Sequence, residues 1–140
     1  MVEESKILRL RVLLMFLQAD TSCTVTGISR TLDVTKQTIS RIIMELEQEG
    51  FIDRSNVRKP KLTSLGFQVA NMYAEKIRIS MNHLMYEGVS IDHAKHDAYF
   101  WALFNSENTM DVIRSSEKRF RVKYELRDQR KFSGLFLSKM

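Results

Sequence analysis

The chain has 140 residues, of which 44% are apolar and 28% charged, a composition typical of one folded domain rather than a disordered segment. The formal net charge of +5 at pH 7, with an isoelectric point near 9.5, permits a polyanionic partner but does not by itself establish one. The single Cys23 excludes an internal disulfide and a zinc site built from cysteines. With no signal-peptide pattern and no apolar run long enough to span a bilayer, we expect a cytoplasmic protein that does not bind membranes.

The first two predicted elements are helices. A helix over residues 5–19 is predicted from apolar residues that recur at helical spacing, namely Ile7, Leu10, Leu14 and Leu17. A turn over residues 20–24 follows, and Thr24 is expected to cap a short second helix at about 25–33.

The next predicted elements are a third helix and a basic hairpin. Thr35 is expected to cap a third helix over residues 36–49, and Gly50 to end it. The apolar period then changes, which predicts two short strands, at 51–54 and 61–63, around the basic loop SNVRKP. Helix, short helix, helix and basic hairpin together indicate a winged helix-turn-helix.

Further helices follow the predicted wing. A long helix at about 65–86 is expected to end at Gly88, and two more are predicted at about 91–104 and 107–117. Apolar and charged residues then alternate from Arg119 onward, which predicts a C-terminal β-hairpin. The predicted fold class is therefore mainly α, with a winged helix-turn-helix and a C-terminal hairpin.

The third helix has two chemically different faces. Ile39, Ile42, Ile43 and Leu46 share one face and must be buried. The opposite face is polar and lacks a carboxylate through residue 43, so it suits contact with base edges and phosphates in a DNA major groove. The expected DNA-binding residues of this helix and its cap are Thr35, Lys36, Gln37, Thr38, Ser40 and Arg41.

The loop after the third helix supplies further positive charge. We expect it to lie along a phosphate backbone or in the minor groove. Its candidate residues are Arg54, Arg58, Lys59 and Lys61. The alternative is a winged-helix module that binds only proteins, in which the polar helix face and the basic loop are ordinary solvated surface. An enzyme is not expected, because the sequence has no phosphate-binding glycine loop, nucleophile elbow or paired acid and base.

The segment LDVTKQTISRIIMELEQEGFIDR resembles the helix-turn-helix of the MarR family and equally that of the metal-dependent repressors of the DtxR family. The following segment, LTSLGFQVANMYAEKIRISMNHLMYEGVSIDHAKHDAYFWALFNSE, is similar to the DtxR family's wing exit and long helix, so the resemblance covers roughly residues 5–115. It implies a homodimer that binds double-stranded DNA at a palindromic site, with the helices after the wing at the dimer interface. Under this resemblance the chain divides into a DNA-binding domain (1–64), a helical dimerisation segment (65–118) and the hairpin (119–140).

The DtxR resemblance also implies a divalent metal. The residues at the family's ligand positions in this chain offer no good metal donor, and they are Leu8, Ile77, Met81, Lys95, Tyr99, Ala102 and Leu103. We therefore expect no metal cofactor and a packed core in its place. A different metal site built from His83, His93 and His96 is the alternative, against the simpler reading that these are exposed polar residues.

Other side chains leave alternatives open. The MarR resemblance would allow a pocket for an apolar effector, although aromatic and methionine residues at helical spacing more often form core or interface. The residues concerned are Met72, Met81, Met85, Tyr99, Phe100, Trp101 and Phe104. Cys23 is expected to be a structural thiol. The basic surplus of residues 114–131 is expected to be a solvated hairpin face rather than an extension of the DNA-binding surface.

Overall fold

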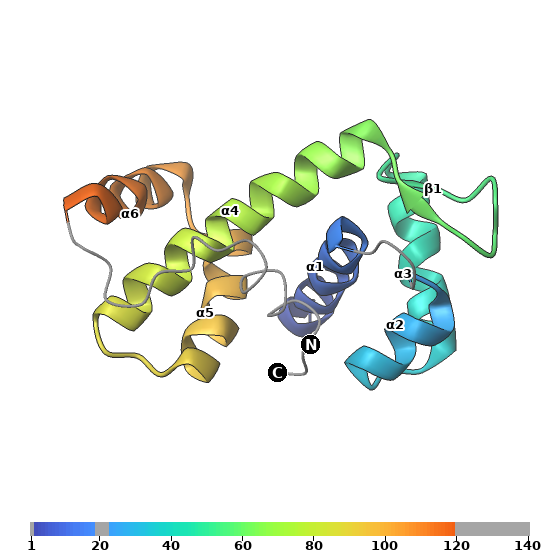
Figure 1. Cartoon of the computed structure of the whole chain (residues 1–140), viewed down its shortest axis with the longest axis horizontal. Coiled ribbons are helices and arrows are strands. Elements are labelled where there is room, and N and C mark those ends of the chain that lie inside the picture. Colours follow the sequence, from blue (N-terminus) through green and yellow to red (C-terminus); the bar gives the residue numbers. More distant parts are fainter. Residues whose placement is uncertain (1, 19–22, 120–140) are drawn as a thin grey trace.

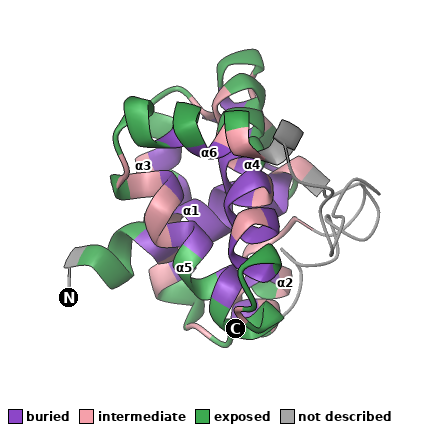
Figure 2. Ribbon diagram, turned by 90° about the vertical axis from the view of Figure 1, so that its left-hand side faces the viewer, coloured by how far each residue is buried: buried purple, intermediate pink, exposed green. Residues whose placement is uncertain are grey.

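Helix α1 (Val2–Gln18) lies near the centre of the molecule (Figure 2). The protein is described here from a computed structural model, which covers residues 2–18 and 23–119. Helix α1 packs against α3 (Lys36–Gln48), α4 (Ser64–Tyr86), α5 (Ile91–Phe104) and strand β2 (Lys61–Leu62). For this reason it buries more than the predicted stripe, including Val12 and even Arg11. It begins three residues before the predicted start, where Glu3 and Glu4 in the first turn favour the helix dipole.

Helices α2 (Val25–Leu32) and α3 (Lys36–Gln48) are joined by a tight turn. The Thr24 hydroxyl accepts a hydrogen bond from the Gly27 N–H at 3.0 Å, which confirms the predicted cap of α2. Asp33 adopts a left-handed conformation, with φ of 57°, and the Val34 N–H then bonds back to the Ser29 carbonyl at 3.1 Å.

Glycine ends α3, as predicted. Gly50 has φ of +86°; its N–H bonds to the Glu47 carbonyl and the next N–H, of Phe51, bonds to the Leu46 carbonyl, both at 2.9 Å. This pair of bonds is a Schellman motif, which satisfies carbonyls at the helix end. Gly88 ends α4 (Ser64–Tyr86) with the same pattern.

The two strands of the wing are shorter than predicted. Strands β1 (Ile52–Asp53) and β2 (Lys61–Leu62) pair antiparallel, with Ile52 opposite Leu62. The residues between them form side-chain turns instead: the Asp53 carboxylate accepts from the Ser55 N–H and the Asn56 side chain accepts from the Arg58 N–H. Such local bonds compete with the β ladder and end it after two residues.

Helix α4 joins the two ends of the molecule, from the wing to the end that carries α5 (Ile91–Phe104) and α6 (Glu107–Arg119) (Figure 1). One hydrophobic core runs from α1 through α3 and α4 to α5. The predicted boundary after residue 64 therefore coincides with the start of a helix but divides a continuous core.

Helix α6 packs on α4 through a small separate cluster of Ile79, Met110 and Ile113. The Lys76 ammonium, almost buried, pairs with the Glu107 carboxylate at 2.7 Å and ties the start of α6 to α4.

Two predictions concern the end of α6. The helix continues to Arg119, past the predicted end at 117, so the placement of residue 119 in a strand was wrong; Glu117, Lys118 and Arg119 are good helix formers. The rest of the predicted hairpin, residues 120–140, lies outside the described residues. Within the described part of the chain, every helix is too short or too polar to cross a bilayer.

Candidate nucleic-acid interface

Helix α3 separates its buried and exposed faces sharply. Ile39, Ile42, Ile43 and Leu46 are each no more than 2% exposed, whereas Lys36, Gln37 and Arg41 are exposed and Thr38 and Ser40 are half-buried. The buried face fixes the helix on the core, and the opposite face is open to a partner. The predicted contact residues thus lie together on one accessible surface.

The N-terminus of α3 is held by its own hydroxyls. The Thr35 hydroxyl donates to the Thr38 hydroxyl at 2.9 Å and accepts from the Thr38 N–H at 3.3 Å, so Thr35 is the predicted N-cap. No acidic residue lies in the first turn. The partial positive charge of the helix start, together with Lys36, therefore favours an anion such as a phosphate.

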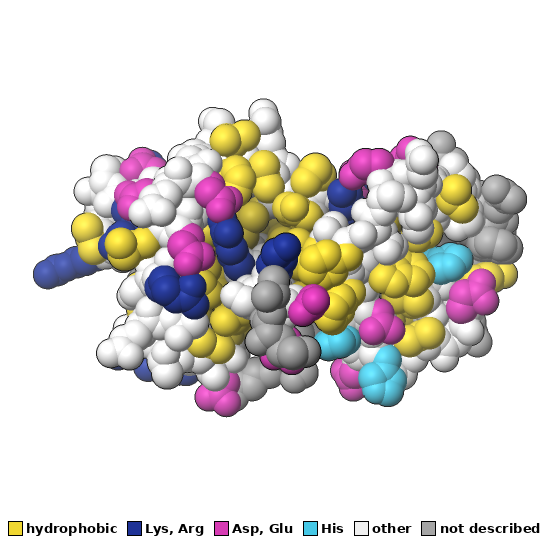
Figure 3. Space-filling view, turned by 180° about the vertical axis from the view of Figure 1, so that it is seen from behind, with side chains coloured by type: hydrophobic (Ala, Val, Ile, Leu, Met, Phe, Trp, Pro, Cys, Tyr) yellow, Lys and Arg dark blue, Asp and Glu magenta, His cyan; other side chains and the backbone are white. Residues whose placement is uncertain are grey.

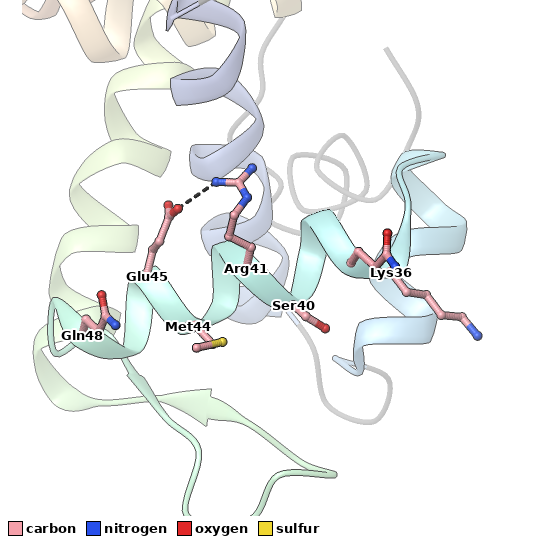
Figure 4. Close-up of a pocket in the computed structure, with 7 residues that line it drawn as sticks. Lys36, Ser40, Arg41, Met44, Glu45 and Gln48 are labelled. Carbon is pink, nitrogen blue, oxygen red and sulfur yellow. Dashed lines mark hydrogen bonds and ion pairs between the residues drawn. The ribbon is translucent and has the colours of Figure 1, made fainter.

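The exposed face extends one turn beyond the predicted contact residues. A shallow depression on α3 is lined by Lys36, Gln37, Ser40, Arg41, Met44, Glu45 and Gln48 (Figure 4). The Arg41 guanidinium donates to the Glu45 carboxylate at 2.7 Å. Met44, Glu45 and Gln48 are not among the predicted contact residues, because base contacts are expected from the N-terminal half of such a helix. Their spacing from Gln37 and Arg41 along one helix face was the signal that could have identified them.

The predicted basic residues of the wing differ in their exposure. Arg58, Lys59 and Lys61 are exposed, and Figure 3 shows Lys or Arg side chains standing out from the wing end of the molecule. Arg54 is half-buried and contacts the Glu47 carboxylate at 3.5 Å, so it links the wing to α3 rather than lying at the loop tip. The three exposed cations form the part of the wing that is open to a polyanion.

Two ion pairs tie the C-terminal end of α3 and its C-cap residue to their surroundings. Glu47 pairs with Arg54 of the wing, and Glu49 pairs with Arg9 of α1. Together with the buried isoleucines, these contacts give the exposed face a fixed orientation relative to the wing.

Comparison with known proteins identifies the fold. Residues 7–61 match the sequence model of the MarR family. The structure of the manganese regulator SloR superimposes with a TM-score of 0.64 at 17% identity, over 81% of this chain and 52% of that one. The fold is a winged helix, and its first helices and wing match the MarR family model.

A second solved structure has the same winged helix over most of its own length. The hypothetical protein SSo2273 from Sulfolobus solfataricus matches with a TM-score of 0.60 at 13% identity, over 84% of this chain and 90% of that one. The present chain spans about half the length of the SloR structure. No curated protein sequence matches it.

The DtxR resemblance implies metal ligands at certain positions, and in this structure those positions do not carry good metal-donor side chains. Ile77, Met81 and Ala102 are buried in the core. Lys95 is 5% exposed, and burial, together with the nearby charge of Arg11, lowers the pKa of its ammonium to about 8. Burial also raises the pKa of the Tyr99 hydroxyl to about 12, so it is not an anionic ligand near neutral pH. These residues do not fit a divalent metal.

The histidines are not gathered into one site. His83 lies against the Trp101 ring, His93 contacts the Ser90 hydroxyl, and His96 contacts Asp97 and the Phe100 ring. Figure 3 shows the histidine side chains as separate patches. Among the described residues, no group of three or more His, Cys, Asp or Glu is arranged to hold a metal ion.

The residues considered for an apolar effector are spread over several environments. Tyr99, Met81 and Met85 belong to the core, while Met72 and Phe104 are each 45% exposed. Phe104 lines a groove of about 400 Å³ between the winged helix and the later helices, whose other walls include Leu13, Phe51, Val69 and Tyr73. The predicted residues therefore do not form one pocket.

Cys23 precedes the cap of α2 and is partly buried. Burial raises the pKa of its thiol to about 12, which leaves almost no thiolate near neutral pH. This environment is that of a structural thiol.

Proposed function

We propose that this protein is a transcription regulator that binds double-stranded DNA as a homodimer, with α3 in the major groove and the wing on the backbone or in the minor groove. The observation that carries the proposal is the division of α3 into a wholly buried isoleucine face and an open polar face beside a basic wing. The winged-helix fold and the match of residues 7–61 to the MarR family support it. We propose repression rather than activation, because a dimer bound to its operator blocks the access of other proteins to that DNA.

Each exposed side chain suits a particular contact. Gln37 has the donor and acceptor needed for adenine, and the Arg41 guanidinium matches the acceptor edge of guanine. Arg58, Lys59 and Lys61 suit phosphates, which carry no sequence information. Affinity would come largely from the wing and specificity from α3.

We also propose that DNA binding is independent of divalent metal. SloR is described as a manganese regulator, but the positions considered for metal ligands in this chain carry apolar groups, a buried lysine and a neutral tyrosine. A cation has no suitable donor set there.

The primary experiment is selection of bound duplexes from a random pool, in chelator and in the presence of Mn²⁺. We expect the same palindromic site under both conditions. A site recovered only with metal would contradict metal independence, and a site without two-fold symmetry would contradict a symmetric dimer. The absence of duplex binding even at low salt would overturn the regulator proposal and favour a protein-interaction module.

Two substitutions then separate the roles of helix and wing. Arg41→Ala should weaken operator binding by about 1–3 kcal/mol and relax the choice of base at one position. Lys59→Ala should weaken operator and random DNA alike and reduce the salt dependence. Equal losses on both DNAs for Arg41→Ala would refute its role in base reading.

A further inference from the structure

Helix α3 carries a carboxylate on the face proposed to meet DNA. Two acids, Glu45 and Glu47, lie in its C-terminal part, and Glu49 is its C-cap; Glu47 pairs with Arg54 of the wing and Glu49 with Arg9 of α1. Glu45 instead accepts a hydrogen bond from the Arg41 Nη1 of its own helix, at 2.7 Å. Its partner is the side chain best suited to read a guanine.

Helix stability does not explain this pair. Both side chains are well exposed, at 57% for Arg41 and 38% for Glu45, and exposed pairs of this kind stabilise proteins very little. The arginine precedes the glutamate, which is the less favourable order, and an acid in the C-terminal half of a helix is opposed by the helix dipole. A carboxylate on this face also repels phosphate, so it lowers affinity for any DNA.

The geometry of the Arg41–Glu45 pair indicates a different role for Glu45. Figure 4 shows Arg41 and Glu45 projecting from the same side of α3, one turn apart and joined by their hydrogen bond. With Nη1 engaged, the guanidinium plane is restrained and its remaining N–H groups are presented together. An unrestrained arginine of the same length would have the freedom to reach the nearest phosphate, which every sequence offers.

We propose that Glu45 is a specificity-determining residue: by positioning Arg41 it directs the guanidinium to a base edge and discourages contact with phosphate. This inference rests on the proposed DNA-binding function. Glu45 thereby lowers the affinity for random DNA and raises the discrimination between operator and random DNA.

The test compares Glu45→Gln with a matched control, Glu49→Gln. Each removes one negative charge, the first within α3 and the second at its C-cap, but the partner of Glu49 is Arg9, which is not a candidate DNA contact. Dissociation constants are measured for the full chain on the selected operator, on operators changed at each base pair, and on random duplex. Far-UV circular dichroism confirms that the variants are folded.

We expect both variants to bind random DNA more tightly, because each loses a repulsive charge. Only Glu45→Gln should lower the ratio of operator to random affinity, by on the order of tenfold, and relax one base position. In an Arg41→Ala background the same substitution should leave this ratio unchanged within about twofold, since the positioned group is gone.

Three results would overturn the inference. A ratio unchanged in Glu45→Gln would show that Arg41 needs no positioning. Equal falls in Glu45→Gln and Glu49→Gln would show a general charge effect, and persistence of the fall without Arg41 would give Glu45 a role of its own. Failure of the unmodified protein to bind any duplex would instead overturn the proposed function, and this inference with it.

Discussion

Replacement of Gly66 by alanine tests the junction between α3, the wing and α4. A Cβ at this position would lie 2.0 Å from the Phe51 carbonyl oxygen and 2.8 Å from its carbon. That oxygen also accepts the Thr63 N–H at 3.0 Å, while the Thr63 hydroxyl donates to the Gly50 carbonyl and accepts from the Gly66 N–H. The obstacle is therefore hydrogen-bonded backbone, which cannot move aside as the end of a flexible side chain does.

The two competing effects set the expected size of the change. In an open helix, alanine in place of glycine would stabilise the protein by at most about 1 kcal/mol. Overpacking costs about 1–3 kcal/mol, and a rigid backbone obstacle places Gly66→Ala at the upper end. The net loss in the free energy of unfolding should be about 2 kcal/mol, equivalent to a fall in Tm of about 6–10 °C for a chain of this size.

Urea and thermal unfolding followed by circular dichroism at 222 nm would measure this loss. Asn71→Ala, on the exposed side of the same helix, serves as the control and should change stability by no more than about 0.5 kcal/mol. If Gly66→Ala were as stable as the unsubstituted protein, the close approach of α4 to Phe51 would be refuted.

Three further perturbations probe the buried groups. The pKa of Lys95 is about 8 in the folded protein and 10.5 ordinarily, so between these values the unfolded chain binds more protons than the folded one. The free energy of unfolding should therefore rise from pH 7 to 9.5. Urea unfolding of Lys95→Met should show a pH dependence smaller by up to about 3 kcal/mol. The rise of the Cys23 thiol pKa from 9.0 to about 12 should slow its alkylation by iodoacetamide at pH 8 by a hundredfold or more relative to the urea-unfolded chain, and equal rates would contradict its burial. Met110→Ala, at a fully buried position between α4 and α6, should cost about 2 kcal/mol and increase amide hydrogen exchange in α6 before the rest of the chain.

The helices could be predicted because their determinants are local. Thr24 and Thr35 cap the helices that they precede, and Gly50 and Gly88 end helices with left-handed backbone, as the sequence indicated. The alternation of isoleucines with polar residues in α3 also fixed which face is buried. Periodicity and capping act within a few residues, so one sequence is enough to reveal them.

The features that were missed depend on contacts between elements. Nothing local marks Gly66 as different from any other helical glycine, because its requirement comes from Phe51, fifteen positions earlier. Nothing in the local sequence distinguishes Arg11 from the other charged residues of the first helix, yet the structure buries it because α1 is covered on several sides. The ion pair of Arg41 with Glu45, by contrast, lies within one helix and could have been predicted from its i, i+4 spacing.

Two buried cations lie near the positions considered for metal ligands. Arg11 on α1 and Lys95 on α5 are both more than nine-tenths buried, and they are close enough for the charge of one to lower the pKa of the other. A dication placed about 5 Å from a single buried cation would be repelled by several kcal/mol at an effective dielectric constant near 20. The Asp92 carboxylate acts on Lys95 in the opposite sense, but its effect is smaller than that of Arg11, so the net effect of these two charges at Lys95 disfavours a dication there. We therefore expect that supplying or removing divalent metal leaves the affinity for the operator unchanged.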